Sequence, residues 1–164
     1  MDKVKAEAEA ELNNAKVEEV TDVNGLKAVK ITFDSGLLFK TSSSELSSAS
    51  KTNLDNLAKL MKKYSTCAID AYGHTDNQGW RNSTAEQSAQ KNLELSQQRA
   101  QSVVDYLKVA GVANSQFKNV VGKGSSEPVA DNSTKAGQDQ NRRVEIYMYA
   151  SEQMVKEAQQ GKLN

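Results

Sequence analysis

At the centre of the chain stands the sequence Cys67-Ala68-Ile69-Asp70-Ala71-Tyr72-Gly73-His74-Thr75-Asp76-Asn77-Gln78-Gly79, which a polar segment separates from Leu95-Ser96-Gln97-Gln98-Arg99-Ala100. Residues 67–72 alternate as a short strand does. After the second motif, apolar side chains recur at helical spacing, at Ala100, Val103, Val104 and Leu107. The sequence therefore predicts a strand that leads through a polar loop into a helix.

This connection carries two opposite charges. Asp76 falls on the loop, and Arg99 falls in the first turn of the helix if Ser96 is its N-cap. An arginine there opposes the helix macrodipole, and a bound carboxylate would explain its position. Asp76 followed by Gly79 is also an ordinary turn sequence, however, and an arginine can simply extend over the surface. The residues alone leave both interpretations open.

Length and charge narrow the classes of protein. At 164 residues the chain has the size of one domain. Basic and acidic residues both number 21, so no overall field attracts a polyanion and nucleic-acid binding is not expected. The one cysteine, Cys67, is expected to be a small buried hydrophobic residue. No segment is apolar enough to span a bilayer, and Met1-Asp2-Lys3-Val4 does not resemble the start of a secretory signal.

Three elements are predicted before the central strand. Residues from about 3 to 15 favour a helix whose apolar positions are mostly alanine and are expected to bury little surface. Residues 17–33 predict a hairpin, because Asn24-Gly25 separates two β-prone runs. The apolar spacing of Leu54–Met61 then predicts a helix that ends near Tyr64.

Further elements are predicted after the central loop. The segment Ser83-Thr84-Ala85-Glu86 is a capping box that predicts a short inserted helix, and Gly111 is expected to end the main helix that follows. A strand is predicted over residues 117–121 and a polar loop over 122–140. Asn141-Arg142-Arg143 then introduces the last strand.

Together these elements predict an α+β fold. The early hairpin requires antiparallel pairing, and the elements alternate too irregularly for an all-parallel, doubly wound sheet. In the last strand Val144, Ile146 and Met148 point one way, as in a sheet with one packed face. We expect two helices on one face of a mixed sheet. The expected units are a helical lead-in over 1–16, one domain over 17–150 and a helical tail over 151–164.

Other polar residues give weaker indications. His74 is the only histidine, so neither a catalytic triad nor a histidine zinc site has its usual members, and no catalytic residue, metal or cofactor is expected. The imidazole is expected instead to hydrogen-bond a backbone group. At least one of Arg142 and Arg143 is expected to tether the long loop, because adjacent side chains on a strand point to opposite faces. Trp80 is either a stacking platform for a ligand or a local anchor.

Several motifs in this order resemble one family. They are Phe33-Asp34-Ser35 before a helix, Gly73-His74-Thr75-Asp76 followed by Gly79, Asn92 with Leu95-Ser96-Gln97-Gln98-Arg99-Ala100, and Asn141-Arg142-Arg143-Val144-Glu145-Ile146. Over about residues 27–150 the chain resembles the OmpA-like C-terminal domain, the peptidoglycan-binding module also found in Pal lipoproteins and MotB stator proteins. An ordered set of motifs is far more specific than any single motif.

The resemblance implies a βαβαβ-type sandwich that binds the stem peptide of peptidoglycan without cleaving it, typically at its meso-diaminopimelate residue. Asp76 and Arg99 match the family residues that hold the diaminopimelate head group, the carboxylate for an ammonium and the guanidinium for a carboxylate. Thr75 and Asn92 are implied as auxiliary contacts, and Arg143 as a contact at the rim.

The expected role is that of a non-catalytic periplasmic module that anchors an outer-membrane or envelope protein of a Gram-negative bacterium to the cell wall. Family members are commonly tethered by a barrel or a lipidated cysteine, and Cys67 lies too far inside the chain for lipidation. A homodimer is compatible with the sequence. The alternative is an envelope protein-interaction scaffold with a degenerate pocket. Residues 80–91 form a longer link than is usual in the family, and we expect this insert to reshape or cover the site.

Overall fold

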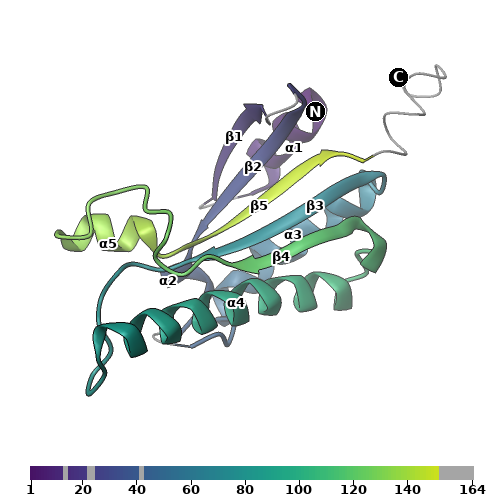
Figure 1. The fold of residues 1–164 in the computed structure, drawn as a ribbon. Helices are drawn as coiled ribbons and strands as arrows, with labels where there is room; N and C mark the ends of the chain where they lie inside the picture. The colour runs from purple at the N-terminus through teal and green to yellow at the C-terminus, as the bar shows by residue number, and fades with distance from the viewer. Residues whose placement is uncertain (13–14, 22–24, 41–42, 152–164) are drawn as a thin grey trace.

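The computed structural model describes residues 1–12, 15–21, 25–40 and 43–151, and a five-stranded sheet with helices runs through them (Figure 1). The strands are β1 (Ala15–Thr21), β2 (Lys27–Asp34), β3 (Cys67–His74), β4 (Phe117–Gly122) and β5 (Arg143–Ala150). Their order in the sheet is β1-β2-β5-β3-β4. All neighbouring strands are antiparallel except β3 and β4, which are parallel. The sheet is therefore mixed, as predicted.

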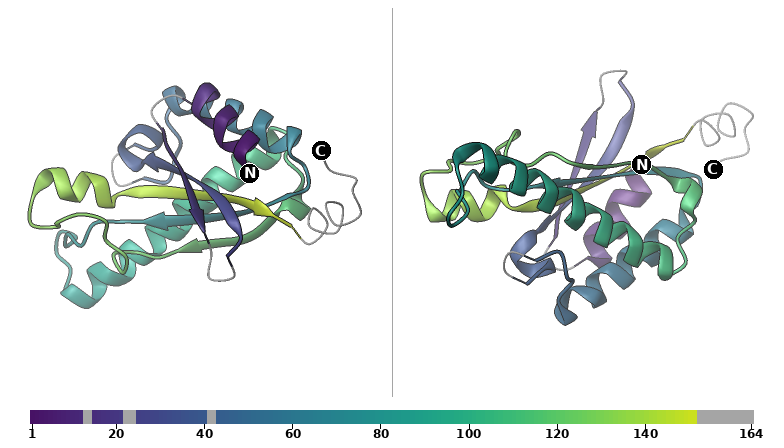
Figure 2. Two further views of the ribbon diagram at one scale, coloured as in Figure 1. Left: turned by 90° about the horizontal axis from the view of Figure 1, so that it is seen from above. Right: turned by 60° about the horizontal axis from the view of Figure 1, so that its bottom comes forward.

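The helices lie mainly on one face of this sheet. They are α1 (Asp2–Glu11), α2 (Ser35–Leu38), α3 (Ser48–Lys63), α4 (Ala85–Val109) and α5 (Lys135–Asn141). Helices α1, α3 and α4 cover the same face (Figure 2), and α3 contacts both of the others. Because parallel strands need a crossover connection, α4 is the element that permits β3 and β4 to pair.

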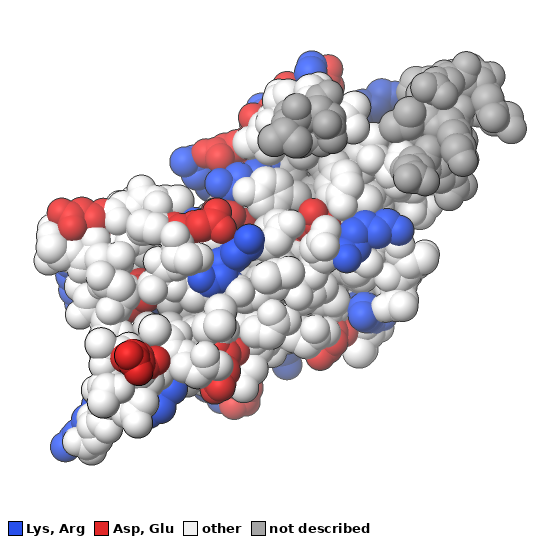
Figure 3. Space-filling model, viewed as in Figure 1, with Lys and Arg blue, Asp and Glu red and all other residues white. Residues whose placement is uncertain are grey.

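The surface mixes both signs of charge. On the face shown in Figure 3, lysine and arginine are interspersed with aspartate and glutamate. This face therefore presents no extended field of one sign to a polyanion. Within the described ranges, no helix combines the length and the apolar character needed to cross a membrane.

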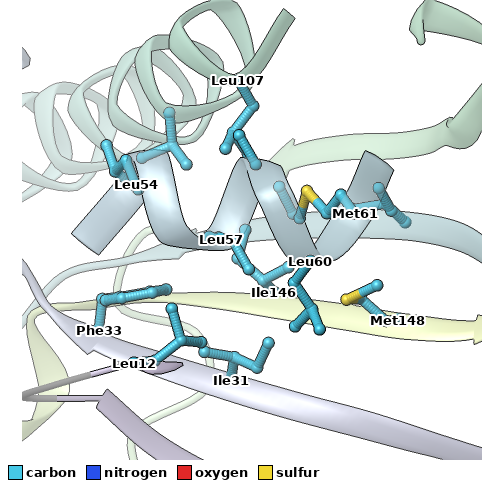
Figure 4. Close-up of a cluster of buried hydrophobic side chains, with 14 of the residues drawn as sticks. Leu12, Ile31, Phe33, Leu54, Leu57, Leu60, Met61, Leu107, Ile146 and Met148 are labelled. Atoms are coloured by element: carbon cyan, nitrogen blue, oxygen red, sulfur yellow. The ribbon is translucent and has the colours of Figure 1, made fainter. Parts of the chain in front are cut away.

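The core lies between the sheet and the three covering helices. Figure 4 shows the leucines of α3 between Leu107 of α4 on one side and Phe33 and Ile146 of the sheet on the other. All of these side chains are almost completely buried. Burial stabilises the fold by about 1.5–3 kcal/mol for each large apolar side chain, so α3 is the main link between the two layers. Cys67 is also buried, as predicted, and burial raises the pKa of its thiol.

Helix α4 differs from the prediction. It is one continuous helix of 25 residues whose N-cap is Thr84, so the expected short inserted helix is its first part. Thr84 and Gln87 form the capping box, and neither glycine nor proline interrupts residues 85–109. The prediction that Ser96 is an N-cap and that Arg99 lies in a first turn was therefore wrong. Both residues lie in the middle of α4.

A pair of glycines explains what Ser96 does instead. Gly73 of β3 lies opposite Gly122 of β4, and α4 crosses both strands at Ser96. A Cβ atom on Gly73 would lie 2.1 Å from the Ser96 carbonyl oxygen, and one on Gly122 would lie 2.3 Å from the Gln97 nitrogen. The Ser96 hydroxyl accepts a hydrogen bond from Gly124 N at 2.9 Å. The absence of two side chains thus lets the helix backbone touch the sheet.

Two further expectations meet a different outcome, and two others are not tested. Val4, Ala8 and Leu12 join the core, so the N-terminal helix buries more surface than its alanine content indicated. Residues 135–140 of the predicted loop form α5 together with Asn141, and this helix lacks apolar periodicity and is capped instead by Thr134. Asn24 of the hairpin turn and residues 152–164 of the predicted helical tail lie outside the described residues.

Candidate functional site

A polar hollow of about 600 Å³ lies at the end of the sheet where β2 and β3 finish and β5 begins. We call it the polar hollow. Its walls come from α2, the loop after β3, the middle of α4 and the residue before β5. Its lining includes Ser35, Thr75, Asp76, Trp80, Asn92, Arg99 and Arg142. Four segments far apart in the sequence therefore meet here.

Asp76 is held in a fixed orientation at this hollow. Its side chain is buried, and Oδ1 accepts a hydrogen bond from Gln78 N at 3.1 Å. Oδ2 forms an ion pair with Nη1 of Arg142, and Nη2 of the same guanidinium pairs with Asp139. Thr75 fixes the loop, because its backbone N–H donates to Gly124 O at 2.8 Å and its hydroxyl donates to Asp76 O.

Arg99 is a buried cation. Its exposed fraction is 5%, Nε donates to Ser43 O at 2.9 Å, and the guanidinium carbon lies 5.0 Å from the centre of the Phe39 ring. Within the described residues it forms no ion pair with a carboxylate. Burial and the nearby charge of Arg142 lower the pKa of Arg99, and Asp76 opposes this shift. A buried guanidinium that lacks a carboxylate partner is suited to bind an anion.

Trp80 and Asn92 brace the insert against the hollow. The indole Nε1 donates to Asn92 Oδ1 at 2.7 Å, and Asn92 Nδ2 donates to Gln78 O at 3.2 Å. The Trp80 backbone N–H donates to Ser88 Oγ at 2.8 Å. Trp80 therefore acts as a local anchor, which is one of the two roles expected for it. Because both residues line the hollow, the insert forms part of its wall.

Arg143 lies apart from the polar hollow. Its guanidinium is buried and donates to Glu145 Oε2 at 2.8 Å, Asn141 O at 3.1 Å and Glu127 O at 2.9 Å. This confirms that one of the two adjacent arginines tethers the long loop. The arginine that reaches the hollow is Arg142, which the site prediction did not include.

His74 also has a different partner from the one expected. Its Nε2 lies 3.1 Å from Glu145 Oε1 rather than against a backbone group. Burial alone would raise the pKa of Glu145, but hydrogen bonds from His74 and Arg143 and the charge of Arg143 lower it far below its usual range. Lys30 Nζ lies 3.3 Å from Glu145 Oε2 as well. Glu145 is therefore the centre of a buried charged cluster that includes His74, Arg143 and Lys30.

Replacing Glu145 by glutamine is expected to lower the free energy of unfolding by about 3 kcal/mol at neutral pH, because Arg143 loses its carboxylate. The pKa of Glu145 is lower in the folded state than its ordinary value of 4.5, so ionised Glu145 stabilises the fold above that pH. This stabilisation is lost as the pH falls. Urea unfolding between about pH 7 and 3 should show a flatter acid decline in the variant than in the wild type. Equal slopes would contradict the role given to Glu145.

The sequence found some members of the site and missed others. Thr75, Asp76, Asn92 and Arg99 come together as predicted, and Arg143 does not join them. Arg142 and Ser35 were missed as members, although both stand in motifs that the sequence singled out. Within the described part of the chain, no three histidine, cysteine, aspartate or glutamate side chains cluster as a metal site would require. The lining of the hollow therefore combines one carboxylate, that of Asp76, with neutral polar groups and four cationic side chains, those of Lys40, Arg81, Arg99 and Arg142.

Comparisons with known proteins give a consistent result. The model of the OmpA family matches residues 38–142. The chain is 39% identical over 108 residues to the probable lipoprotein YiaD of Escherichia coli, a match that covers 66% of this chain and 45% of that protein. It is 40% identical over 93 residues to the peptidoglycan-binding protein ArfA of Mycobacterium tuberculosis, covering 57% of this chain and 26% of ArfA. The chain thus spans less than half the length of either relative.

The fold has close counterparts among solved structures. The cell wall anchor of the T6SS from Pseudomonas aeruginosa superimposes with a TM-score of 0.69 and 29% sequence identity. The superposition covers 92% of this chain and 93% of that one. The similarity therefore extends beyond the segment that the family model matches.

Proposed function

This chain belongs to the OmpA family, and on that premise we propose that it binds peptidoglycan in the polar hollow, through the diaminopimelate residue of the stem peptide, without cleaving it. One observation carries the proposal. Arg99 is buried in the wall of the hollow, pairs with no carboxylate among the described residues, and shares the hollow with the carboxylate of Asp76. A ligand with a carboxylate and an ammonium on one carbon atom matches this arrangement.

Each group of the hollow has a defined role in this proposal. The guanidinium of Arg99 receives the ligand carboxylate as a planar fork, and Asp76 accepts hydrogen bonds from the ammonium. Arg142 already pairs with Asp76 and keeps its carboxylate in place. Thr75 and Asn92 support the loop that carries Asp76, and they supply auxiliary polar groups. Arg143 acts only indirectly, by holding the long loop.

The wider role follows from the relatives. One is named a peptidoglycan-binding protein, one a probable lipoprotein, and one a cell wall anchor. We infer that this chain likewise acts in the periplasm, where it links the outer membrane or an envelope assembly to the wall. Contact with the membrane would then come from an anchor and not from the polar hollow.

Calorimetry with a diaminopimelate-bearing muropeptide tests the proposal. We expect saturable binding with one site per chain, and much weaker binding of the matching lysine-bearing muropeptide, because lysine lacks the second carboxylate. Chromatography after prolonged incubation should recover the muropeptide intact. Retention on purified peptidoglycan should be abolished by free diaminopimelate. Equal binding of the two muropeptides would contradict the assignment of Arg99.

A further inference from the structure

One polar atom in the wall of the polar hollow has no partner within the described part of the chain. It is the hydroxyl oxygen of Ser35, a residue with an exposed fraction of 2%. Ser35 lines the hollow, whereas the other such atom, Nδ1 of His74, belongs to a residue that does not. A buried hydroxyl without a partner is costly to the free protein, so a ligand that supplies the missing hydrogen bond gains affinity.

The position of Ser35 associates it with the part of the hollow that contains the Asp76 carboxylate. Ser35 directly follows β2, and its backbone N–H donates to Arg142 O at 2.9 Å. Arg142 in turn pairs with Asp76. Arg99, by contrast, is carried by α4 and held by Ser43. Ser35 therefore belongs with the groups to which the proposed function assigns the ammonium of the ligand.

We propose that the Ser35 hydroxyl is a further binding group of the polar hollow, which accepts a hydrogen bond from the ammonium that Asp76 holds. This inference rests on the proposed function. An alkylammonium has three N–H donors. The Asp76 carboxylate already accepts hydrogen bonds from Gln78 N and from Arg142, so the ammonium needs an additional acceptor. The Ser35 hydroxyl supplies it, on a residue whose backbone N–H already donates to Arg142 O.

The test compares Ser35→Ala with the wild type on two muropeptides. One carries diaminopimelate, and the other carries an analogue in which hydrogen replaces the free amine. We expect the substitution to weaken binding of the first about tenfold and to change binding of the second by less than about twofold. The free energy of unfolding should be unchanged or higher, because the variant loses a buried hydroxyl that had no partner.

Ser50→Ala is the matched control. Ser50 is also buried, but its hydroxyl donates to Ser47 O at 2.7 Å and it does not line the hollow. We expect this control to be less stable and to bind both muropeptides as the wild type does. Equal affinities of Ser35→Ala and wild type would overturn the inference, as would an equal loss on both muropeptides. A wild type that binds neither muropeptide would instead contradict the proposed function itself.

Discussion

Replacing Arg99 by alanine is expected to weaken the affinity for a diaminopimelate-bearing muropeptide by about 100-fold or more, a loss of about 3 kcal/mol. The effect is large because the guanidinium is buried, so little water screens its interaction with the ligand carboxylate. Isothermal calorimetry at two salt concentrations measures it. Since the pair is desolvated, we expect the loss to change little with salt.

Three variants separate this role from general effects. Arg81 also lines the hollow but is exposed, and Arg81→Ala should change affinity by less than about threefold. Arg99→Lys retains the charge without the planar fork and should recover only part of the loss. Asp76→Ala should weaken binding comparably to Arg99→Ala. If Arg99→Ala binds like the wild type while remaining folded, the guanidinium is not the carboxylate site.

Replacing Gly122 by alanine is expected to destabilise the fold by about 3–5 kcal/mol. The new Cβ would lie 2.3 Å from Gln97 N, 2.5 Å from Ser96 Oγ and 2.7 Å from Gln97 Cα. Two of these atoms belong to the helix backbone, so no side-chain rotation relieves the contact. The whole of α4 must move away from β3 and β4, and its buried residues Val103 and Leu107 lose packing. Chemical denaturation measures the loss of stability.

Gly79→Ala is the matched control for this prediction. A Cβ on Gly79 would meet only Ser88 Oγ, at the ordinary distance of 3.6 Å. Its substitution should therefore change the free energy of unfolding by less than about 1 kcal/mol. Similar stabilities of Gly122→Ala and Gly79→Ala would show that α4 does not depend on the close approach. Gly73→Ala, with its Cβ 2.1 Å from Ser96 O, should resemble Gly122→Ala.

Most strands and helices could be predicted because each is encoded by a local pattern. The alternation from Cys67 produced β3, and the spacing of Leu54–Met61 produced the middle of α3. The start of α4 was misplaced because Thr84 and Ser96 are both residue types that cap helices. The tertiary structure distinguishes the two, because Gly73 and Gly122 leave room for the α4 backbone to contact the sheet at Ser96. That contact cannot be recognised from the residues around Ser96.

The sequence by itself determined the mixed α+β architecture, the family resemblance and the expectation that Asp76 and Arg99 serve one site. Only the tertiary structure decided that Arg142, and not Arg143, reaches the polar hollow, and that Ser35 lines it with a hydroxyl that has no partner among the described residues. The physical reason is the range of the interactions. Periodicity and capping act over a few residues, whereas Arg142 meets Asp76 across 66 positions and Arg99 meets Ser43 across 56. Such pairs exist only once β2, β3 and β5 are aligned and α4 has packed against the sheet.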